Sequence, residues 1–149
     1  MWLTVGLADT FGTDYDPWIR YDFGLTTYVD AMKVWNYNES YYCNSGIKKM
    51  EVLYSSDGDN WDSFGQVTLD EAPFSTSVPF GQLIALGVTA RYIQFDIIED
   101  YCGNLYPAPP VPLQDNWAVG LSEVRFIPEP ATFLLLATGG LFVRKRRKS

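Results

Sequence analysis

Short segments in which apolar and polar residues alternate are the feature that most limits how this chain can fold. In Trp18–Gly24, the side chains of Ile19, Tyr21 and Phe23 would share one face of an extended chain. Four further segments have the same period of two and are predicted as half-buried strands: Ala31–Tyr37, Lys48–Ser55, Arg91–Ile98 and Val119–Ile127. With five tryptophans, ten tyrosines and nine phenylalanines and no long 3.6-residue periodicity, the sequence predicts an all-β domain.

The predicted strands define a core and a set of connections. The residues expected to face inward are Met32, Val34, Met50, Val52, Tyr54, Ile93, Phe95, Ile97, Val124 and Phe126. Ser56–Asn60 is predicted to turn the chain, because Gly58 can take a positive φ, and Trp61 is predicted to open a return strand. The expected long connections are Asn38–Gly46, Leu69–Gly87 and Glu99–Trp117. Long loops on a scaffold of short strands usually carry whatever function there is.

The net charge of the chain and its residue types exclude several classes of partner and of catalytic site. The chain before residue 128 carries six basic and 17 acidic side chains, a net charge of −11. Such a surface repels nucleic acid and anionic lipid, so the expected partners are neutral glycans or cations such as calcium. The sequence has no histidine, the commonest general base and zinc ligand, and no motif of a nucleophilic, phosphate-binding or metalloprotease site. We therefore expect a protein that is not an enzyme.

A three-part tail follows the predicted domain of residues 1–127 and fills residues 128–149. It consists of Pro128, Glu129 and Pro130, an apolar segment over residues 131–143, and the basic run Arg144, Lys145, Arg146, Arg147 and Lys148. The prolines should end the preceding strand, and the basic run should stay on the cytoplasmic side of a membrane. The apolar segment has 13 residues, which as a helix would span about 20 Å against a hydrocarbon core of about 30 Å. The tail thus predicts a short transmembrane helix with the domain outside.

The tail resembles the PEP-CTERM sorting signal of bacterial proteins that an exosortase processes. Pro128, Glu129 and Pro130 match the motif of that family residue for residue. The resemblance implies export, anchoring in the inner membrane before processing, and a final place at the cell surface or in the extracellular matrix of a Gram-negative-type bacterium. The alternative is an ordinary short anchor after a coincidental Pro-Glu-Pro.

The predicted strands resemble the discoidin-like, galactose-binding-like family, the coagulation-factor C-type modules, which fold as an antiparallel β-sandwich of the jelly-roll kind. The resemblance rests on five ordered stretches: Trp18–Gly24, Val34–Asn38, Gly46–Trp61, Ala90–Phe95 and Gly120–Phe126. The family has further strands, and often a calcium-binding loop, before this region. Because residues 1–13 also lack a secretory signal pattern, we expect a signal peptide and the N-terminal strands to be missing from the sequence. No cofactor is expected, although calcium could bind to a complete domain.

The two cysteines, Cys43 and Cys102, lie in two different predicted loops. In an exported chain such a pair is expected to form a disulfide, which would close a loop of about 60 residues and add roughly 4 kcal/mol of stability. The alternatives are two free thiols or a metal pair, and the latter has no supporting ligands nearby.

The predicted disulfide would gather aromatic side chains of the two loops on one surface. These residues are Tyr41, Tyr42, Tyr101, Tyr106 and Trp117. Sugar rings stack on such side chains, so this surface is the candidate glycan-binding site. The alternative is that the aromatic side chains seal the open end of the sandwich.

Three aspartates crowd the predicted turn after Ser55. Asp57, Asp59 and Asp62 have a spacing that could hold a hard cation, but the full loop pattern and the closing glutamate of an EF-hand are absent. Turn chemistry explains Asp57 and Asp59 without a metal, and no metal site is predicted.

The sequence predicts a non-enzymatic, exported cell-surface protein that is sorted by an exosortase and could bind extracellular polysaccharide. One alternative is the accessory carbohydrate-binding part of a secreted glycan-active enzyme, which would need a catalytic domain upstream of Met1. Another is a structural surface protein without a ligand.

Overall fold

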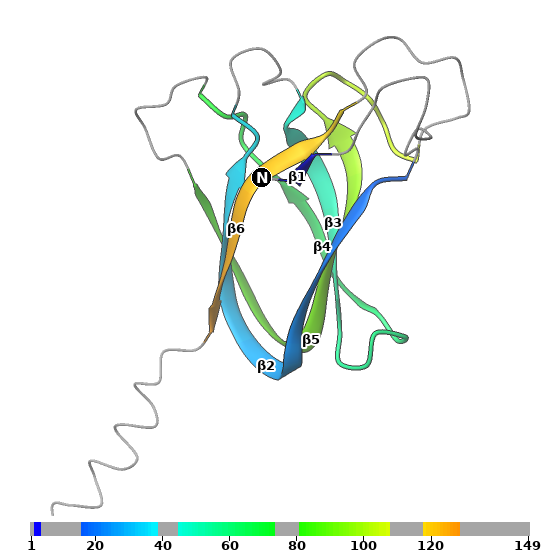
Figure 1. Ribbon diagram of the computed structural model, residues 1–149, viewed down its shortest axis with the longest axis vertical. Coiled ribbons are helices and arrows are strands. Elements are labelled where there is room, and N and C mark those ends of the chain that lie inside the picture. The colour runs from blue at the N-terminus through cyan, green and yellow to red at the C-terminus, as the bar shows by residue number, and fades with distance from the viewer. Residues whose placement is uncertain (1, 4–15, 39–44, 74–80, 108–117, 129–149) are drawn as a thin grey trace, which may run out of the picture.

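The computed structural model describes residues 2–3, 16–38, 45–73, 81–107 and 118–128. Six strands lie in this part of the chain: β1 (Trp2–Leu3), β2 (Trp18–Asn36), β3 (Ile47–Ser55), β4 (Asp62–Thr68), β5 (Gln82–Asp100) and β6 (Gly120–Pro128). They form one antiparallel sheet in the order β1-β6-β2-β5-β3-β4 (Figure 1). The described residues contain no helix, so the all-β prediction is confirmed. Among them there is accordingly no helix that could cross a membrane, and the apolar segment 131–143 lies outside them.

The single sheet folds over on itself to make a sandwich. Strands β2 and β5 are 19 residues long, and both bend at the lower end of the sheet in Figure 1. The first half of β2 pairs with the second half of β5, which also pairs with β3. The second half of β2 pairs with the first half of β5 and with β6. We name the two layers the β3 layer and the β6 layer, and β2 and β5 contribute to both.

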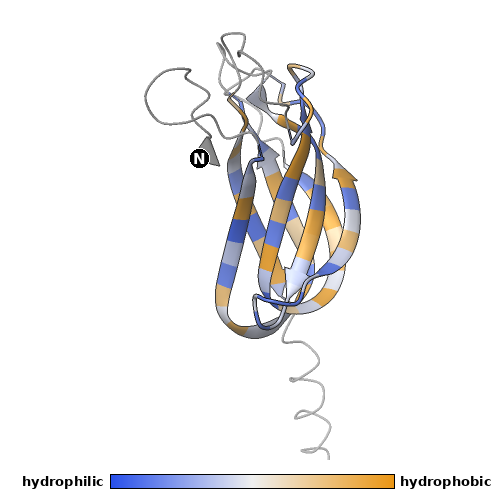
Figure 2. Ribbon diagram, turned by 90° about the vertical axis from the view of Figure 1, so that its right-hand side faces the viewer, coloured by the Kyte–Doolittle hydropathy of each residue, from blue (hydrophilic) through white to orange (hydrophobic). Residues whose placement is uncertain are grey.

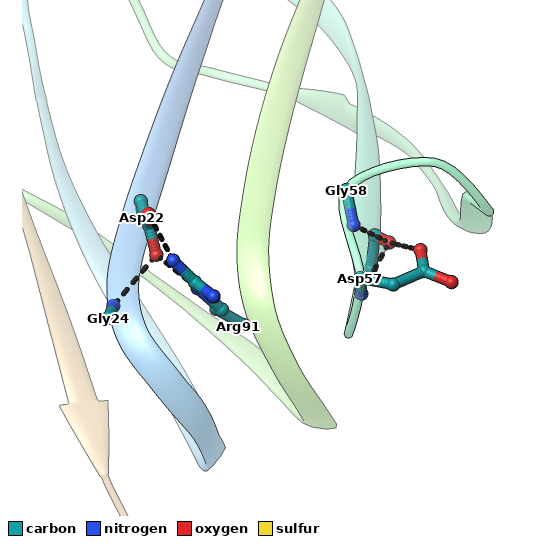
Figure 3. Close-up of polar contacts among 6 residues, drawn as sticks. Asp22, Gly24, Asp57, Gly58 and Arg91 are labelled. Carbon is teal, nitrogen blue, oxygen red and sulfur yellow. Dashed lines mark hydrogen bonds and ion pairs between the residues drawn. The ribbon is translucent and has the colours of Figure 1, made fainter.

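The bend of β2 is a bulge at Gly24. The pairing of β2 with β5 shifts between Asp22 and Thr27, and Gly24 has a φ of 77°. The Gly24 N–H donates to the Asp22 carboxylate at 2.7 Å, and the Arg91 side chain contacts the same carboxylate at 2.9 Å (Figure 3). The Arg91 guanidinium, followed by the Gly24 N–H, lowers the pKa of Asp22. These contacts fix the direction in which β2 turns from one layer to the other.

The core lies between the two layers, where the predicted inward faces meet. Hydrophobic and hydrophilic residues alternate along the strands in Figure 2. Of the predicted inward residues, Met32, Val34, Met50, Val52, Ile93, Phe95 and Ile97 are buried, and Ile19, Tyr21, Phe23, Tyr54, Val124 and Phe126 pack against them. The Phe126 ring of the β6 layer lies 4.9 Å from the Tyr21 ring and 6.4 Å from the Phe95 ring of the β3 layer. Burial raises the pKa of Tyr21 to about 12.

Two predicted boundaries are wrong. The strands predicted at Trp18–Gly24 and Ala31–Tyr37 are one bent strand, since the bulge lets β2 continue through an exposed stretch. The predicted connection Leu69–Gly87 is too long, because β5 already begins at Gln82. Leu83 is an apolar residue on the outer side of that strand, where it is 64% exposed. The sequence therefore lacks the alternation of apolar and polar residues that marks a half-buried strand.

The predicted turn between β3 and β4 is confirmed. Gly58 has a φ of 88°, and its N–H donates to the Ser55 hydroxyl at 2.9 Å. The Asp57 carboxylate accepts hydrogen bonds from the backbone N–H groups of Asp59 and Asn60 at 2.9 and 2.8 Å. Asp57 is therefore the residue that organises this turn.

Candidate functional site

One end of the sandwich gathers the ends of five strands and is called the loop end here. Gly46, just before β3, forms a bridge with Gly120, the first residue of β6. The side chain of Gln82, at the start of β5, donates to the carbonyl oxygen of Thr68, the last residue of β4, at 3.0 Å. The connections β2–β3, β4–β5 and β5–β6 therefore all leave from this end (Figure 1). The bends of β2 and β5 and the β3–β4 turn lie at the opposite end.

The Asn36 side chain ties the first two connections together. It is buried at the end of β2, and its amide nitrogen donates to the carbonyl oxygens of Ile47 at 2.7 Å and Asp70 at 3.0 Å. Its oxygen accepts from the backbone N–H groups of Tyr37 and Ile47, both at 2.9 Å. Asn36 thus satisfies backbone groups of three segments that would otherwise be buried without partners.

The Asp100 carboxylate organises the start of the third connection. Asp100 is fully buried at the end of β5. It accepts hydrogen bonds from the backbone and side chain of Asn104, at 2.9 and 2.8 Å, and from the Tyr106 hydroxyl at 3.1 Å. Burial raises the pKa of this carboxyl, although the hydrogen bonds from Asn104, Tyr106 and the backbone of Cys102 oppose the shift. The carboxylate is engaged in holding the loop rather than turned toward solvent.

Tyr101 lies at the junction of the loop-end connections and is half-buried. Its backbone N–H donates to the Gly46 carbonyl oxygen at 3.0 Å, and its hydroxyl donates to the Leu69 carbonyl oxygen at 2.5 Å. Burial, followed by the neighbouring charges of Asp70 and Glu71, raises the pKa of its hydroxyl. Tyr101 therefore holds a fixed position on an acidic part of the loop end.

The structure describes two of the five residues predicted to bind a glycan, and it separates them. Tyr101 is partly open to solvent, whereas Tyr106 is buried and its hydroxyl is bonded to Asp100. The ring of Tyr106 packs in the core, so at this position the alternative role of sealing the sandwich applies. The other three predicted residues, Tyr41, Tyr42 and Trp117, lie outside the described residues.

The predicted disulfide cannot be followed in the structure, because Cys43 lies outside the described residues. Cys102 is exposed in the loop after β5. The pairing of Cys43 with Cys102 stays a prediction. In the sorting motif, Pro128 ends β6, while Glu129, Pro130 and the basic run that begins at Arg144 lie outside the described part of the chain.

Sequence reasoning missed the groups that shape the loop end. Asn36 and Asp100 are polar residues at strand ends, and their burial depends on segments far apart in the chain. The only local signal was the pair Asp100 and Asn104, four residues apart in a stretch with turn-forming residues. No sequence pattern predicted that the side chain of Leu105, next to Tyr106, would be 63% exposed.

Two family models match the sequence. The model of the NedA-like, galactose-binding domain matches residues 2–95, and the model of the PEP-CTERM protein-sorting motif matches residues 126–148. No curated protein matches the sequence.

Several solved structures share the fold. The C-terminal domain of a chitobiase from Bacteroides fragilis has 19% identity and a TM-score of 0.51, over 74% of this chain and 62% of that chain. A CBM32 module from Clostridium perfringens, in complex with GalNAc-beta-1,3-galactose, has 12% identity and a TM-score of 0.53, over 74% and 65% of the two chains. An F5/8 type C domain from Bacteroides fragilis has 13% identity and a TM-score of 0.53, over 84% and 70%. The chain spans less than two thirds of the first two structures.

The matches bear on both predicted parts of the chain. The predicted likeness to galactose-binding-like domains is confirmed by the first family model and by the shared sandwich fold. The predicted sorting motif is confirmed by the second model, and such a motif marks an exported protein that an exosortase processes. The chain belongs to the family of NedA-like, galactose-binding domains and ends in a PEP-CTERM protein-sorting motif.

Proposed function

We propose that this protein is a non-enzymatic surface protein that binds neutral extracellular polysaccharide at the loop end. The boundary between the binding domain and the sorting signal falls after residue 127 in this proposal. The signal holds the protein in the inner membrane until processing, after which the domain remains at the cell surface or in the extracellular matrix. A disulfide between Cys43 and Cys102 would fasten two of the loop-end connections to each other.

The course of β6 is the observation that carries the proposal. The strand starts at the loop end, where Gly120 bridges to Gly46, and it ends at Pro128, which pairs with Val29 near the bend of β2. Its nine residues correspond to about 25 Å of extended chain. The sorting motif is therefore joined to the end of the sandwich opposite the loops (Figure 1). A protein held through its tail would turn its loops away from the point of attachment.

The negative charge of the domain and its structural similarity to a CBM32 module support a neutral sugar as the ligand. The chain before residue 128 has a net charge of −11, and Asp70 and Glu71 lie close enough to Tyr101 to raise its pKa. This field disfavours polyanionic polysaccharides. The related module from Clostridium perfringens was solved with GalNAc-beta-1,3-galactose, a neutral disaccharide. We take galactose- and N-acetylgalactosamine-containing glycans as the first ligands to test.

The test is to measure binding of the full chain to immobilised neutral and acidic glycans, including GalNAc-beta-1,3-galactose. We expect binding to neutral glycans that falls about fivefold in Tyr101→Ala, because the loss of one stacking ring costs roughly 1 kcal/mol. Tyr101→Phe keeps the ring and loses only the hydrogen bond to Leu69, so it should bind nearly as well as the wild type. Trp35→Ala, on the outer face of the β6 layer, is the control.

Two results would contradict the proposal. One is a preference for acidic glycans, which the charge argument forbids. The other is equal binding by Tyr101→Ala and the wild type, together with unchanged binding by alanine variants of Tyr41, Tyr42 and Trp117. In that case the loop end is not the site.

A further inference from the structure

The outer face of the β3 layer carries a second group of aromatic side chains. Trp18 begins β2 and is 52% exposed. The guanidinium carbon of Arg20 lies 5.1 Å from the centre of the Trp18 ring and 4.5 Å from the centre of the Trp61 ring. Arg20 therefore sits between two indoles, one from β2 and one from the β3–β4 turn. We call Trp18, Arg20 and Trp61 the indole platform.

A row of hydrogen bonds holds the indole platform in place. Arg20 Nε donates to Gln94 Oε1 at 2.8 Å, and Gln94 Nε2 donates to Asp96 Oδ1 at 2.6 Å. The pairing of β2 with β5 places Arg20 opposite Gln94 and Trp18 opposite Asp96. The Trp61 indole N–H donates to the Gly58 carbonyl oxygen at 3.0 Å. Arg20 and the Trp61 ring are thus held in place before any ligand arrives, and the Arg20 guanidinium backs the Trp18 ring, which lowers the entropy cost of binding.

Trp35, on the outer face of the β6 layer, is an indole in this domain that its neighbours cover more fully than Trp18 is covered. Lys33 Nζ lies 4.9 Å from the centre of its ring, and the Arg125 guanidinium carbon lies 5.1 Å from it. A Cβ on Gly81 would come within 2.7 Å of the Trp35 ring, so that side is filled as well. Trp18, by contrast, is backed by Arg20 and leaves more than half of its surface open.

We propose that the indole platform is a second sugar-binding surface, at which the Trp18 ring stacks on a neutral sugar residue of a polysaccharide chain. The apolar face of a sugar ring packs against an indole, and its hydroxyl groups need polar partners at the edge. Here the carboxylate of Asp96 accepts from a hydroxyl, and the guanidinium of Arg20 donates to one. This surface is separate from the loop end and does not depend on binding there.

The charges around the indole platform select a neutral ligand. Asp96 lies opposite Trp18 on one side and opposite Glu51 of β3 on the other. A carboxylated sugar on the Trp18 ring would approach both carboxylates, and Arg20 balances only one of them. A neutral polyhydroxyl chain meets no such repulsion and can use the carboxylates as hydrogen-bond acceptors.

The test uses the full chain with a soluble neutral galactan and a soluble neutral glucan as probes. Tryptophan oxidation by N-bromosuccinimide, mapped by peptide mass spectrometry, should slow at Trp18 when a binding probe is present and stay unchanged at Trp35. Affinity for that probe should fall about five- to tenfold in Trp18→Ala, with no change in Trp35→Ala. Thermal unfolding of each variant reports on folding independently.

The outcomes separate this surface from the loop end. If Tyr101→Ala weakens binding while Trp18→Ala does not and Trp18 is not protected, the indole platform is overturned and the proposed function stands. If Trp18→Ala alone weakens binding, the platform stands and the loop-end proposal fails. Binding of neither probe overturns the platform. A change from dimer to monomer in Trp18→Ala by light scattering, without a change in sugar binding, would assign the surface to self-association instead.

Discussion

Two aspartates organise turns at opposite ends of the sandwich, in opposite environments. Asp57 is exposed in the β3–β4 turn and accepts hydrogen bonds from the backbone and the side chain of Asn60, both at 2.8 Å (Figure 3 shows the residue in its turn). Asp100 is buried at the loop end and accepts similar bonds from the backbone and side chain of Asn104, at 2.9 and 2.8 Å. The two turns thus use nearly the same contacts.

The pKa values of the two carboxyl groups nevertheless move in opposite directions. The Asn60 side chain, then the backbone N–H groups of Asn60 and Asp59, hold the pKa of Asp57 well below its usual range. Burial raises the pKa of Asp100 despite its hydrogen bonds. The comparison shows that hydrogen bonds define the shape of such a turn, whereas exposure to water decides whether its carboxylate is stabilised or penalised.

The largest effect is expected for Asp100→Ala. The backbone and side-chain N–H groups of Asn104 and the hydroxyl of Tyr106 would lose their acceptor at a buried site. We expect a loss of about 3 kcal/mol in the free energy of unfolding, measured by urea denaturation. A loss no larger than that of Asp57→Ala would show that burial does not distinguish the two turns.

A rise in pH should change the stability contributions of Asp57 and Asp100 in opposite directions. The folded protein holds the proton of Asp100 to a higher pH than the unfolded chain, so this group's contribution to stability falls as pH rises from the usual pKa to the raised one. Asp57 is the reverse: its contribution is present above the usual pKa and is lost as pH falls toward the lowered one.

Urea denaturation between pH 3 and 8 can measure this difference. Relative to wild type, Asp100→Asn should gain stability as pH rises through the range in which Asp100 ionises. Asp57→Asn should instead lose stability relative to wild type as pH rises through the acidic part of the range, where the carboxyl of the unfolded chain titrates. Parallel curves for the two variants would refute the assigned shifts.

The smallest effect is expected for Asp57→Ala. The N–H groups released by this change are exposed and can bond to water, and the Ser55 hydroxyl still accepts from the Gly58 N–H. We expect a lower unfolding temperature by differential scanning calorimetry, with a shift clearly smaller than that of Asp100→Ala. Ser55→Ala serves as the matched change in the same turn, and a shift in Asp57→Ala that exceeds the Asp100→Ala shift would reverse the ranking.

The strands could be predicted because each has one face in the core. The alternation around Tyr21, Val52 and Phe95 survives in the sequence since it reports burial directly. The continuity of β2 could not be predicted, because the bulge at Gly24 is followed by exposed Leu25, and no local pattern marks a strand that changes layers.

The loop end was less predictable than the strands. Tyr101 was found because it is an aromatic residue in a long loop, but the same argument included Tyr106, whose burial depends on Asp100. The indole platform was not predicted, because its contacts also depend on the fold. Trp18 and Trp61 lie in two different predicted strands, and only the folded chain brings both rings to Arg20.

The folded-over sheet has a consequence for the order in which the chain can acquire its structure. Arg20 bonds to Gln94, 74 positions further along, so the first half of β2 has its strand partner only after most of the domain has been synthesised. Such distant pairing slows folding. Because β2 and β5 each belong to both layers, neither layer can close early without the other. In an exported chain with this topology, the two layers can be completed only after both β2 and β5 have reached the same side of the membrane.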